Sequence, residues 1–148
     1  DSHMVKRLRE NRKNKKGFTL VELIVVIVII LVLAAVMVPS VMRYVDKANR
    51  ANTKSDAATV LVDVQAQVAD LAINKTSPTS LNSNGVDVDI IAATSTNLPV
   101  ATYDTTKKKP MANCQINAEG DISYFSYADA KYNAVWSPTN GWTGSWAD

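Results

Sequence analysis

The chain of 148 residues contains one histidine and one cysteine, which leaves little material for a catalytic or metal site. The histidine lies in Asp1-Ser2-His3, ahead of Met4, and we interpret residues 1–3 as the remnant of an expression tag. No phosphate-binding loop, pair of metal ligands or nucleophile with a neighbouring base can be assembled from the remainder. We therefore predict that the protein is not an enzyme and binds neither a metal nor a cofactor.

The lone cysteine, Cys114, excludes an intrachain disulfide. We predict that Cys114 is a small buried hydrophobic side chain on a strand. The alternative is a reactive or intermolecular thiol.

An even distribution of positive charge is also missing. Residues 5–17 hold seven of the basic side chains and one acid, whereas residues 18–148 hold nine basic and twelve acidic ones, a net charge of −3. The net charge of +2 for the whole chain is therefore no sign of nucleic-acid binding, and we expect no specific nucleic-acid partner. We interpret Lys107-Lys108-Lys109, the dense basic run outside the N-terminal stretch, as an exposed loop, with binding of DNA or an anionic surface as the alternative.

One long apolar run is present. Between Gly17 and Arg43 the one ionisable side chain is Glu22, and Leu23 to Met42 supply twenty residues. At about 1.5 Å per residue these span roughly 30 Å, the thickness of a bilayer's hydrocarbon core. We predict that residues 18–42 cross the cytoplasmic membrane, with the basic N-terminus in the cytoplasm and the later residues outside.

Gly17 is followed directly by Phe18-Thr19-Leu20-Val21-Glu22, a basic stretch precedes it, and Pro39 lies inside the apolar run. This arrangement, over about residues 13–48, closely resembles the N-terminus of type IV prepilins and the related pseudopilins. The resemblance implies a leader at residues 4–17, with Lys15 and Lys16 before the cut. A prepilin peptidase would cleave between Gly17 and Phe18 and methylate the new amino group. The lack of a second cysteine departs from the disulfide-stapled pilins of many double-membraned bacteria and favours a Gram-positive source.

The resemblance also assigns assembly roles to Glu22 and Pro39. Glu22 would complement the amine of Phe18 on a neighbouring subunit, since a buried carboxylate costs several kcal/mol unless it is paired. The alternative is a carboxylate at the cytoplasmic membrane edge that reaches towards the headgroups. Pro39 removes a helix hydrogen bond and should kink or loosen the helix. Residues 34–39 would melt on entry into a filament, or the kink would be passive.

A single helix is predicted from Phe18 to about Ile73, because Val41 to Ile73 contains neither glycine nor proline and Asn74 to Pro78 is a plausible terminator. Residues 43–75 form the amphipathic second half. At 100° per residue, Ala57 to Ile73 within it present two apolar faces. The larger should pack on this subunit's own sheet and comprises Val60, Leu61, Val64, Val68 and Leu71. The smaller should meet other subunits and comprises Val62, Ala66, Ala69 and Ile73.

Charged residues on the same helix form two groups. The basic group is Arg43, Lys47, Arg50 and Lys54, and the acidic group is Asp56, Asp63 and Asp70. One interpretation is a solvated surface, since exposed ion pairs contribute little. The other is that the basic group of one subunit meets the acidic group of the next and sets their axial register.

Residues 76–148 are rich in serine, threonine, asparagine and short β-branched or aromatic runs, which predicts a globular head with a small antiparallel sheet. The clearest hairpin joins Ala112–Asn117 to Asp121–Tyr127, and a third strand follows at Tyr132–Trp136. Asn82 to Gly85 predicts a turn, Asp87 to Ala92 a short strand or helical turn, and three tryptophans should cover the core. The fold class is α+β, a long helix packed on a sheet.

We therefore expect a pilin that polymerises through its N-terminal helix into a surface filament for adhesion, motility or DNA uptake. Its partners would be prepilin peptidase, other pilin subunits, the pilus assembly platform and membrane lipids. One alternative is a pseudopilin of a secretion or competence machine. A different class is a single-pass membrane-anchored binding module.

Overall fold

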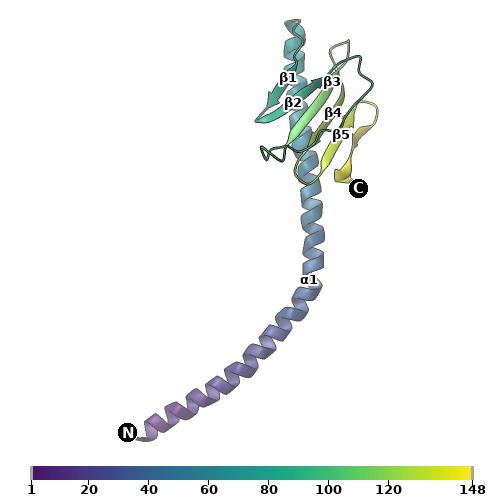
Figure 1. The fold of residues 1–148 in the computed structure, drawn as a ribbon. Coiled ribbons are helices and arrows are strands. Elements are labelled where there is room, and N and C mark those ends of the chain that lie inside the picture. The colour runs from purple at the N-terminus through teal and green to yellow at the C-terminus, as the bar shows by residue number, and fades with distance from the viewer. Residues whose placement is uncertain (1, 148) are drawn as a thin grey trace. The chain divides into compact units, whose positions relative to one another are not determined.

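The computed structural model describes the backbone of residues 2–147 and the side chains of residues 19–147. The chain forms two compact units, Asp1–Val45 and Asp46–Asp148. Helix α1 (Ser2–Ile73) supplies all of the described first unit and the first element of the second (Figure 1). The single long helix predicted from the sequence is confirmed, and it remains helical through Pro39.

The helix ends by a backbone motif that the asparagine and proline signals only partly predict. The amide of Thr76 donates to the carbonyl of Leu71 at 2.9 Å, and the amide of Lys75 donates to that of Ala72 at 3.2 Å. This is the Schellman arrangement, in which the residue after the cap takes a left-handed conformation. Here that residue is Lys75, with φ of 54°, where glycine is the usual choice.

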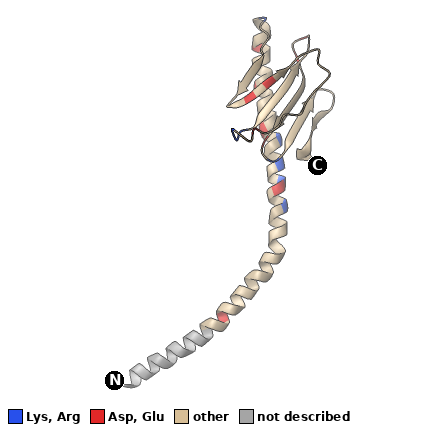
Figure 2. Cartoon of the chain, in the orientation of Figure 1, with Lys and Arg blue, Asp and Glu red and all other residues tan. Residues whose placement is uncertain are grey.

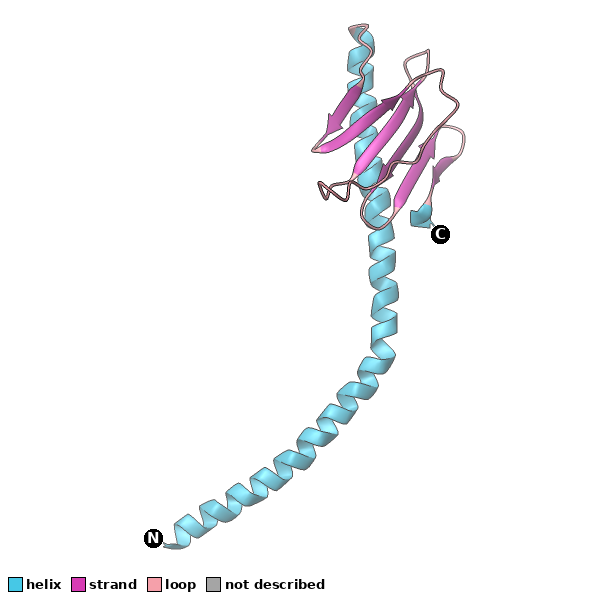
Figure 3. Ribbon diagram, viewed as in Figure 1, coloured by secondary structure: helices cyan, strands magenta, loops and turns pink. Residues whose placement is uncertain are grey.

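Six strands in chain order form one sheet against the last part of α1 (Figure 3). They are β1 (Ser80–Ser83), β2 (Val86–Ile91), β3 (Met111–Ile116), β4 (Ile122–Ala128), β5 (Asn133–Ser137) and β6 (Gly141–Thr143), followed by the short helix η1 (Ser145–Ala147). The α+β class, the β3–β4 hairpin and the β5 strand are confirmed. Strands β1 and β6 are additional to the prediction. The turn predicted within Asn82 to Gly85 is confirmed at Asn84-Gly85, which joins β1 to β2.

The sheet is not purely antiparallel, which corrects the prediction. Strand β2 pairs with β3 in parallel, with Val88 opposite Ala112 and Ile90 opposite Cys114. A parallel pair needs a crossover that returns the chain to the same end of the sheet. Residues 92–110 make that return without forming a helix, so no periodic signal in the sequence marked it.

Polar side chains on β3 and β4 hold this crossover in place. The amides of Asn113 and Gln115 donate to the carbonyls of Pro99 and Ala92 at 2.9 and 2.8 Å. The amide of Ala101 donates to the Ser126 hydroxyl at 2.8 Å. Asn113, Gln115 and Ser126 are buried. The crossover supplies their hydrogen-bond partners, and without these partners their burial would cost free energy.

The opposite face of the sheet packs on the larger apolar face of α1, as predicted. Val60, Leu61, Val64 and Val68 are buried, whereas Leu71 is half-buried. Their partners on the strands include Val88, Ala112, Cys114, Phe125 and Ala134, with Trp136, Trp142 and Trp146 packed around the margin. Burial of each large side chain contributes about 1.5–3 kcal/mol, so this helix face and the sheet stabilise each other.

Cys114 lies in the middle of this core, as predicted. Its side chain is fully buried, and burial raises the pKa of the thiol to about 12. Because thiolate is the reactive form, the thiol is inert at physiological pH. The reactive-thiol alternative therefore has no support in the folded head.

The C-terminal segment approaches β5 so closely that one position requires glycine. Gly144 has φ of 112°, and a Cβ there would lie 2.8 Å from the side-chain oxygen of Asn133. Ser145 next to it exchanges two hydrogen bonds of 2.8 Å with Asn133. Any larger residue would strain the backbone and displace this pair.

We predict that Gly144→Ala lowers the free energy of unfolding of the head by about 2–4 kcal/mol, the sum of left-handed strain and overpacking. Gly141→Ala is the control, because Gly141 has φ of 67° but open space around it, and it should lose only about 1 kcal/mol. Urea unfolding of the detergent-solubilised full chain, followed by tryptophan fluorescence, measures both. Equal losses would show that close approach at Gly144 is unimportant.

Candidate assembly site

The described part of the first unit is an apolar helix that the chain does not cover. Its large hydrophobic side chains from Leu20 to Val45 are between 45% and 71% exposed. Within residues 19–147, one helix is long and apolar enough to cross a membrane; its most apolar window has a mean hydropathy of 3.4 and is not buried. The core helix of a soluble protein would be mostly buried, so this segment needs lipid or another protein as its surroundings.

Glu22 is exposed on this apolar helix. Among the described residues it has no hydrogen-bond or ion-pair partner. Gly17, Phe18, Lys15 and Lys16, which the sequence analysis assigned to processing, lie outside the residues whose side chains the structure describes. The pairing of Glu22 with the Phe18 amine remains a prediction.

The basic and acidic residues of α1 are coloured on the ribbon in Figure 2, and their side chains differ in exposure. Lys47, Asp56 and Asp70 are exposed, and Lys54 and Asp63 are half-buried. Asp63 accepts a hydrogen bond of 3.0 Å from Gln67 four residues along. Arg43, also exposed, belongs to the first unit. The described residues form no ion pair with any of these six charged groups.

Arg50, the remaining member of the basic group, is engaged within its own head. Its Nε pairs with Asp46 at 2.9 Å, and its Nη1 donates to the carbonyls of Ser145 and Trp146 at 2.8 and 3.3 Å. The guanidinium lies 4.4 Å from the centre of the Tyr132 ring. Tyr132 in turn donates its hydroxyl to Asp46. Arg50 thus ties η1 and the β4–β5 turn to the helix.

Sequence reasoning missed this cluster because its members are far apart in the chain. The local signal was the spacing of Asp46 and Arg50, which places the two side chains one turn apart on a helix. Tyr132 and the η1 carbonyls are brought to Arg50 by the sheet. A second hydrogen bond also joins α1 to the β4–β5 turn: the hydroxyl of the fully buried Thr53 donates to the carboxylate of Asp129.

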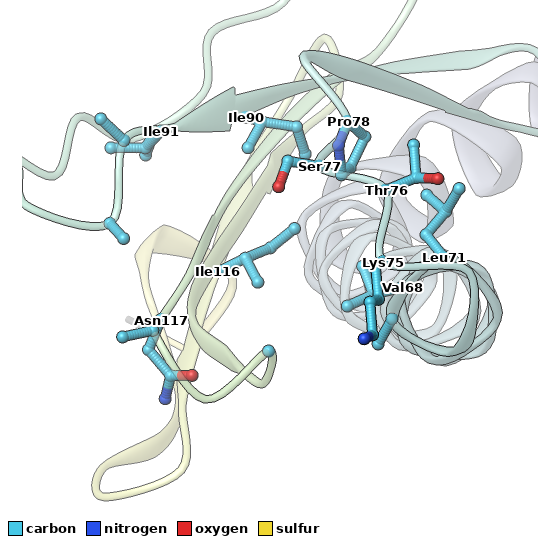
Figure 4. Close-up of a pocket in the computed structure, with 15 residues that line it drawn as sticks. Val68, Leu71, Lys75, Thr76, Ser77, Pro78, Ile90, Ile91, Ile116 and Asn117 are labelled. Carbon is cyan, nitrogen blue, oxygen red and sulfur yellow. The ribbon is translucent and has the colours of Figure 1, made fainter.

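A pocket of about 500 Å³ opens where α1 ends (Figure 4). Val68 and Leu71 line one wall, Ile90 and Ile116 line the other, and Ser77 and Lys75 stand at the connecting loop. The lining is largely apolar, and no charged pair faces into it. In residues 19–147 no three His, Cys, Asp or Glu side chains lie together as a metal site.

The basic loop is placed on the head surface. Lys107 and Lys108 are exposed in a turn, whereas Lys109 pairs with Asp87 of β2. Hydrogen bonds from Lys109 and Asn82 lower the pKa of the Asp87 carboxyl. One of the three charges is therefore neutralised within the chain.

Residues 12–38 match the family model described as the prokaryotic N-terminal methylation motif. The chain thus carries a signal of the type IV prepilin kind, and the resemblance inferred from Gly17, Glu22 and the apolar run is confirmed. The motif marks structural proteins rather than enzymes, implies processing by prepilin peptidase and assembly with other pilins, and fits a membrane-anchored precursor. Comparisons with curated proteins and with solved structures found no match to the chain. The Gram-positive source stays a prediction.

We predict that Arg50→Lys destabilises the head by about 1–3 kcal/mol, because lysine keeps the charge but loses the planar stacking and the simultaneous hydrogen bonds. Lys47→Ala on the same helix is the control and should change stability by less than about 0.5 kcal/mol. Unfolding of the full chain in detergent gives both values. Wild-type stability of Arg50→Lys would show that the cluster is held by charge alone.

Proposed function

We propose that this chain is the precursor of a type IV pilin, a structural subunit that is held in the cytoplasmic membrane before it polymerises into a surface filament. The observation that carries the proposal is the coincidence of the methylation motif at residues 12–38 with an uncovered apolar helix. A membrane anchor alone requires only the helix. The motif adds a processing step whose product has a new amino terminus.

Processing and assembly are linked through charge. Cleavage between Gly17 and Phe18 removes the basic leader at residues 4–17, including Lys15 and Lys16, and leaves the amine of Phe18 at the start of the apolar helix. In a filament core, Glu22 would be withdrawn from water and would require a cation. The Phe18 amine of a neighbouring subunit supplies it, so only processed subunits have the complement that Glu22 needs.

The remaining assignments follow the same scheme. Residues 18–42 form the segment that leaves lipid for the filament, residues 43–75 carry the head, and residues 76–148 contain its whole sheet. Pro39 weakens the backbone near the outer membrane surface, so residues 34–39 can melt and lengthen the subunit under load. The assembly platform extracts processed subunits from the membrane, and the filament serves adhesion, motility or DNA uptake.

Mass spectrometry of the protein isolated from its native cells tests the processing step. A mature chain that begins at a methylated Phe18 is the expected result. An intact leader would contradict the proposal and would favour a membrane-anchored binding module. Electron microscopy of cells that lack this chain separates the two filament functions: loss of long surface filaments supports a pilin, and a secretion or transformation defect with filaments unchanged indicates a pseudopilin.

We predict that Glu22→Ala leaves cleavage unchanged but reduces the yield of sheared surface filaments at least about tenfold, because the Phe18 amine would then be buried without a counter-charge. Gel mobility reports cleavage, and the sheared fraction reports assembly. Glu119→Ala, which removes an exposed carboxylate from the β3–β4 turn, is the control. Normal filament yield with Glu22→Ala would show that Glu22 has no part in assembly.

A further inference from the structure

The pocket at the end of α1 owes its shape to the parallel pairing of β2 with β3. Strand β2 ends at Ile91 and β3 at Ile116, on the same edge of the sheet. Beyond that edge the chain from β2 enters the crossover, residues 92–110, whereas the chain from β3 turns directly into β4. Parallel strands whose connections diverge leave a crevice at their carboxyl ends, where many sheets bind ligands. The last turn of α1 closes this crevice from the helix side and completes a pocket of about 500 Å³.

The walls of this pocket are fixed by hydrogen bonds within the head. The side-chain amide of Gln115 donates to the carbonyl of Ala92 at 2.8 Å and holds the start of the crossover. The side-chain oxygen of Asn117 accepts hydrogen bonds from the amides of Glu119 and Asp121 at 3.1 and 2.9 Å, which holds the turn between β3 and β4. A pocket that is already formed loses less free energy to ordering when a ligand binds.

The lining combines aliphatic walls with two polar groups on the connecting loop. Side chains of α1, β2 and β3 supply most of the walls, and Ile116 reaches from the sheet towards the helix (Figure 4). The Ser77 hydroxyl turns towards the same space and has no hydrogen-bond partner among the described residues. Lys75 brings a positive charge to the lining, and within residues 19–147 it forms no ion pair. Such a lining suits a ligand with an apolar body and one polar group at its end.

The charge of that polar group follows from Lys75. The acids of the neighbouring turn, Glu119 and Asp121, are exposed and do not line the pocket. The carboxyl end of a helix disfavours an anion, but two of the last carbonyls of α1 already accept hydrogen bonds from the backbone amides that follow them. The group that complements this pocket is therefore an anion placed near Lys75.

Lys75 also occupies a backbone position that is unfavourable for lysine. Its φ of 54° lies in the left-handed region, where glycine is the usual residue after a helix. Outliers of this kind cluster at sites that hold ligands, because there the side chain has a use that offsets the strain. Within the described residues the Lys75 side chain makes no hydrogen bond or ion pair that the fold would need. An anion at the mouth of the pocket gives its ammonium group a partner.

We propose that this pocket binds a small amphiphilic anion, a monocarboxylate with an aliphatic body. The body packs between Leu71, Ile90 and Ile116, which line the pocket from both sides. The carboxylate lies beside the Lys75 ammonium and accepts a hydrogen bond from the Ser77 hydroxyl. All of these residues belong to the head unit of one chain, so the site depends neither on polymerisation nor on the proposed pilin function.

Octanoate is the ligand for the test, and octanamide, its uncharged isostere, is the matched control. The full chain is placed in lipid nanodiscs with isotope-labelled isoleucine methyl groups, and each ligand is titrated while NMR spectra are recorded. Ile90, Ile91 and Ile116 report the pocket, whereas Ile27 in the apolar run reports partition into the lipid. The expected result is a saturable shift of the pocket isoleucines, with octanoate bound about threefold more tightly than octanamide, the effect of a partly exposed ion pair.

Exchange of the charged side chain tests the assigned charge. Lys75→Gln should weaken octanoate binding about threefold and leave octanamide binding unchanged, because the ammonium interacts with the carboxylate alone. Lys131→Gln, on the exposed β4–β5 turn, is the matched control and should change neither affinity. Equal binding of octanoate and octanamide by the wild-type chain would overturn the assignment of an anion.

A second pair of variants tests the place of binding at positions where the fold tolerates a larger side chain. Ala118 and Ala130 are both exposed residues of turns, and of the two Ala118 lines the pocket. Ala118→Trp should fill part of the pocket and weaken octanoate binding several-fold, whereas Ala130→Trp should leave it unchanged. Pocket isoleucines that do not shift at high octanoate, or full affinity in Ala118→Trp, would overturn the site.

Discussion

An apolar helix that its own chain cannot cover is the constraint on which the rest of this protein depends. Leu23 to Met42 expose their hydrophobic side chains almost without interruption, and water is a poor solvent for such a surface. Under the proposed function, lipid covers the helix before assembly and neighbouring subunits cover it afterwards. Glu22 would then be the residue that distinguishes these two environments, because a carboxylate tolerated at a membrane edge needs a partner inside a filament.

In the head, by contrast, one face of the same helix is covered by the chain's own sheet. The head buries Val60, Leu61, Val64 and Val68 under the sheet and leaves Val62 and Ile73 exposed. Arg50 ties the C-terminal segment back to the start of this helical section, so this part of the helix belongs to a braced domain. The same helix is therefore an exposed apolar segment in the first unit and a core element in the second.

Much of this architecture could be predicted because it depends on local pattern. The absence of glycine and proline after Val41 predicted the helix, and the larger of its two apolar faces predicted which side is buried. The Ala118-Glu119-Gly120 turn predicted the hairpin of β3 and β4. The parallel pairing of β2 with β3 could not be predicted, because residues 92–110 carry no period and are held by Asn113, Gln115 and Ser126 from across the sheet. Strand β6 was missed for a similar reason, since three residues give too short a pattern.

The sequence by itself determined the processing signal, the membrane-spanning length and the single carboxylate within it, since each is a property of consecutive residues. Only the tertiary structure decided which charges remain available to a partner. Arg50 and Lys54 have the same sign and lie one turn apart on α1. The fold brings two carbonyls and an aromatic ring to Arg50, whereas Lys54 has no ion-pair partner among the described residues. The physical reason is that charge follows from residue type, whereas its compensation depends on side chains that only folding brings within reach.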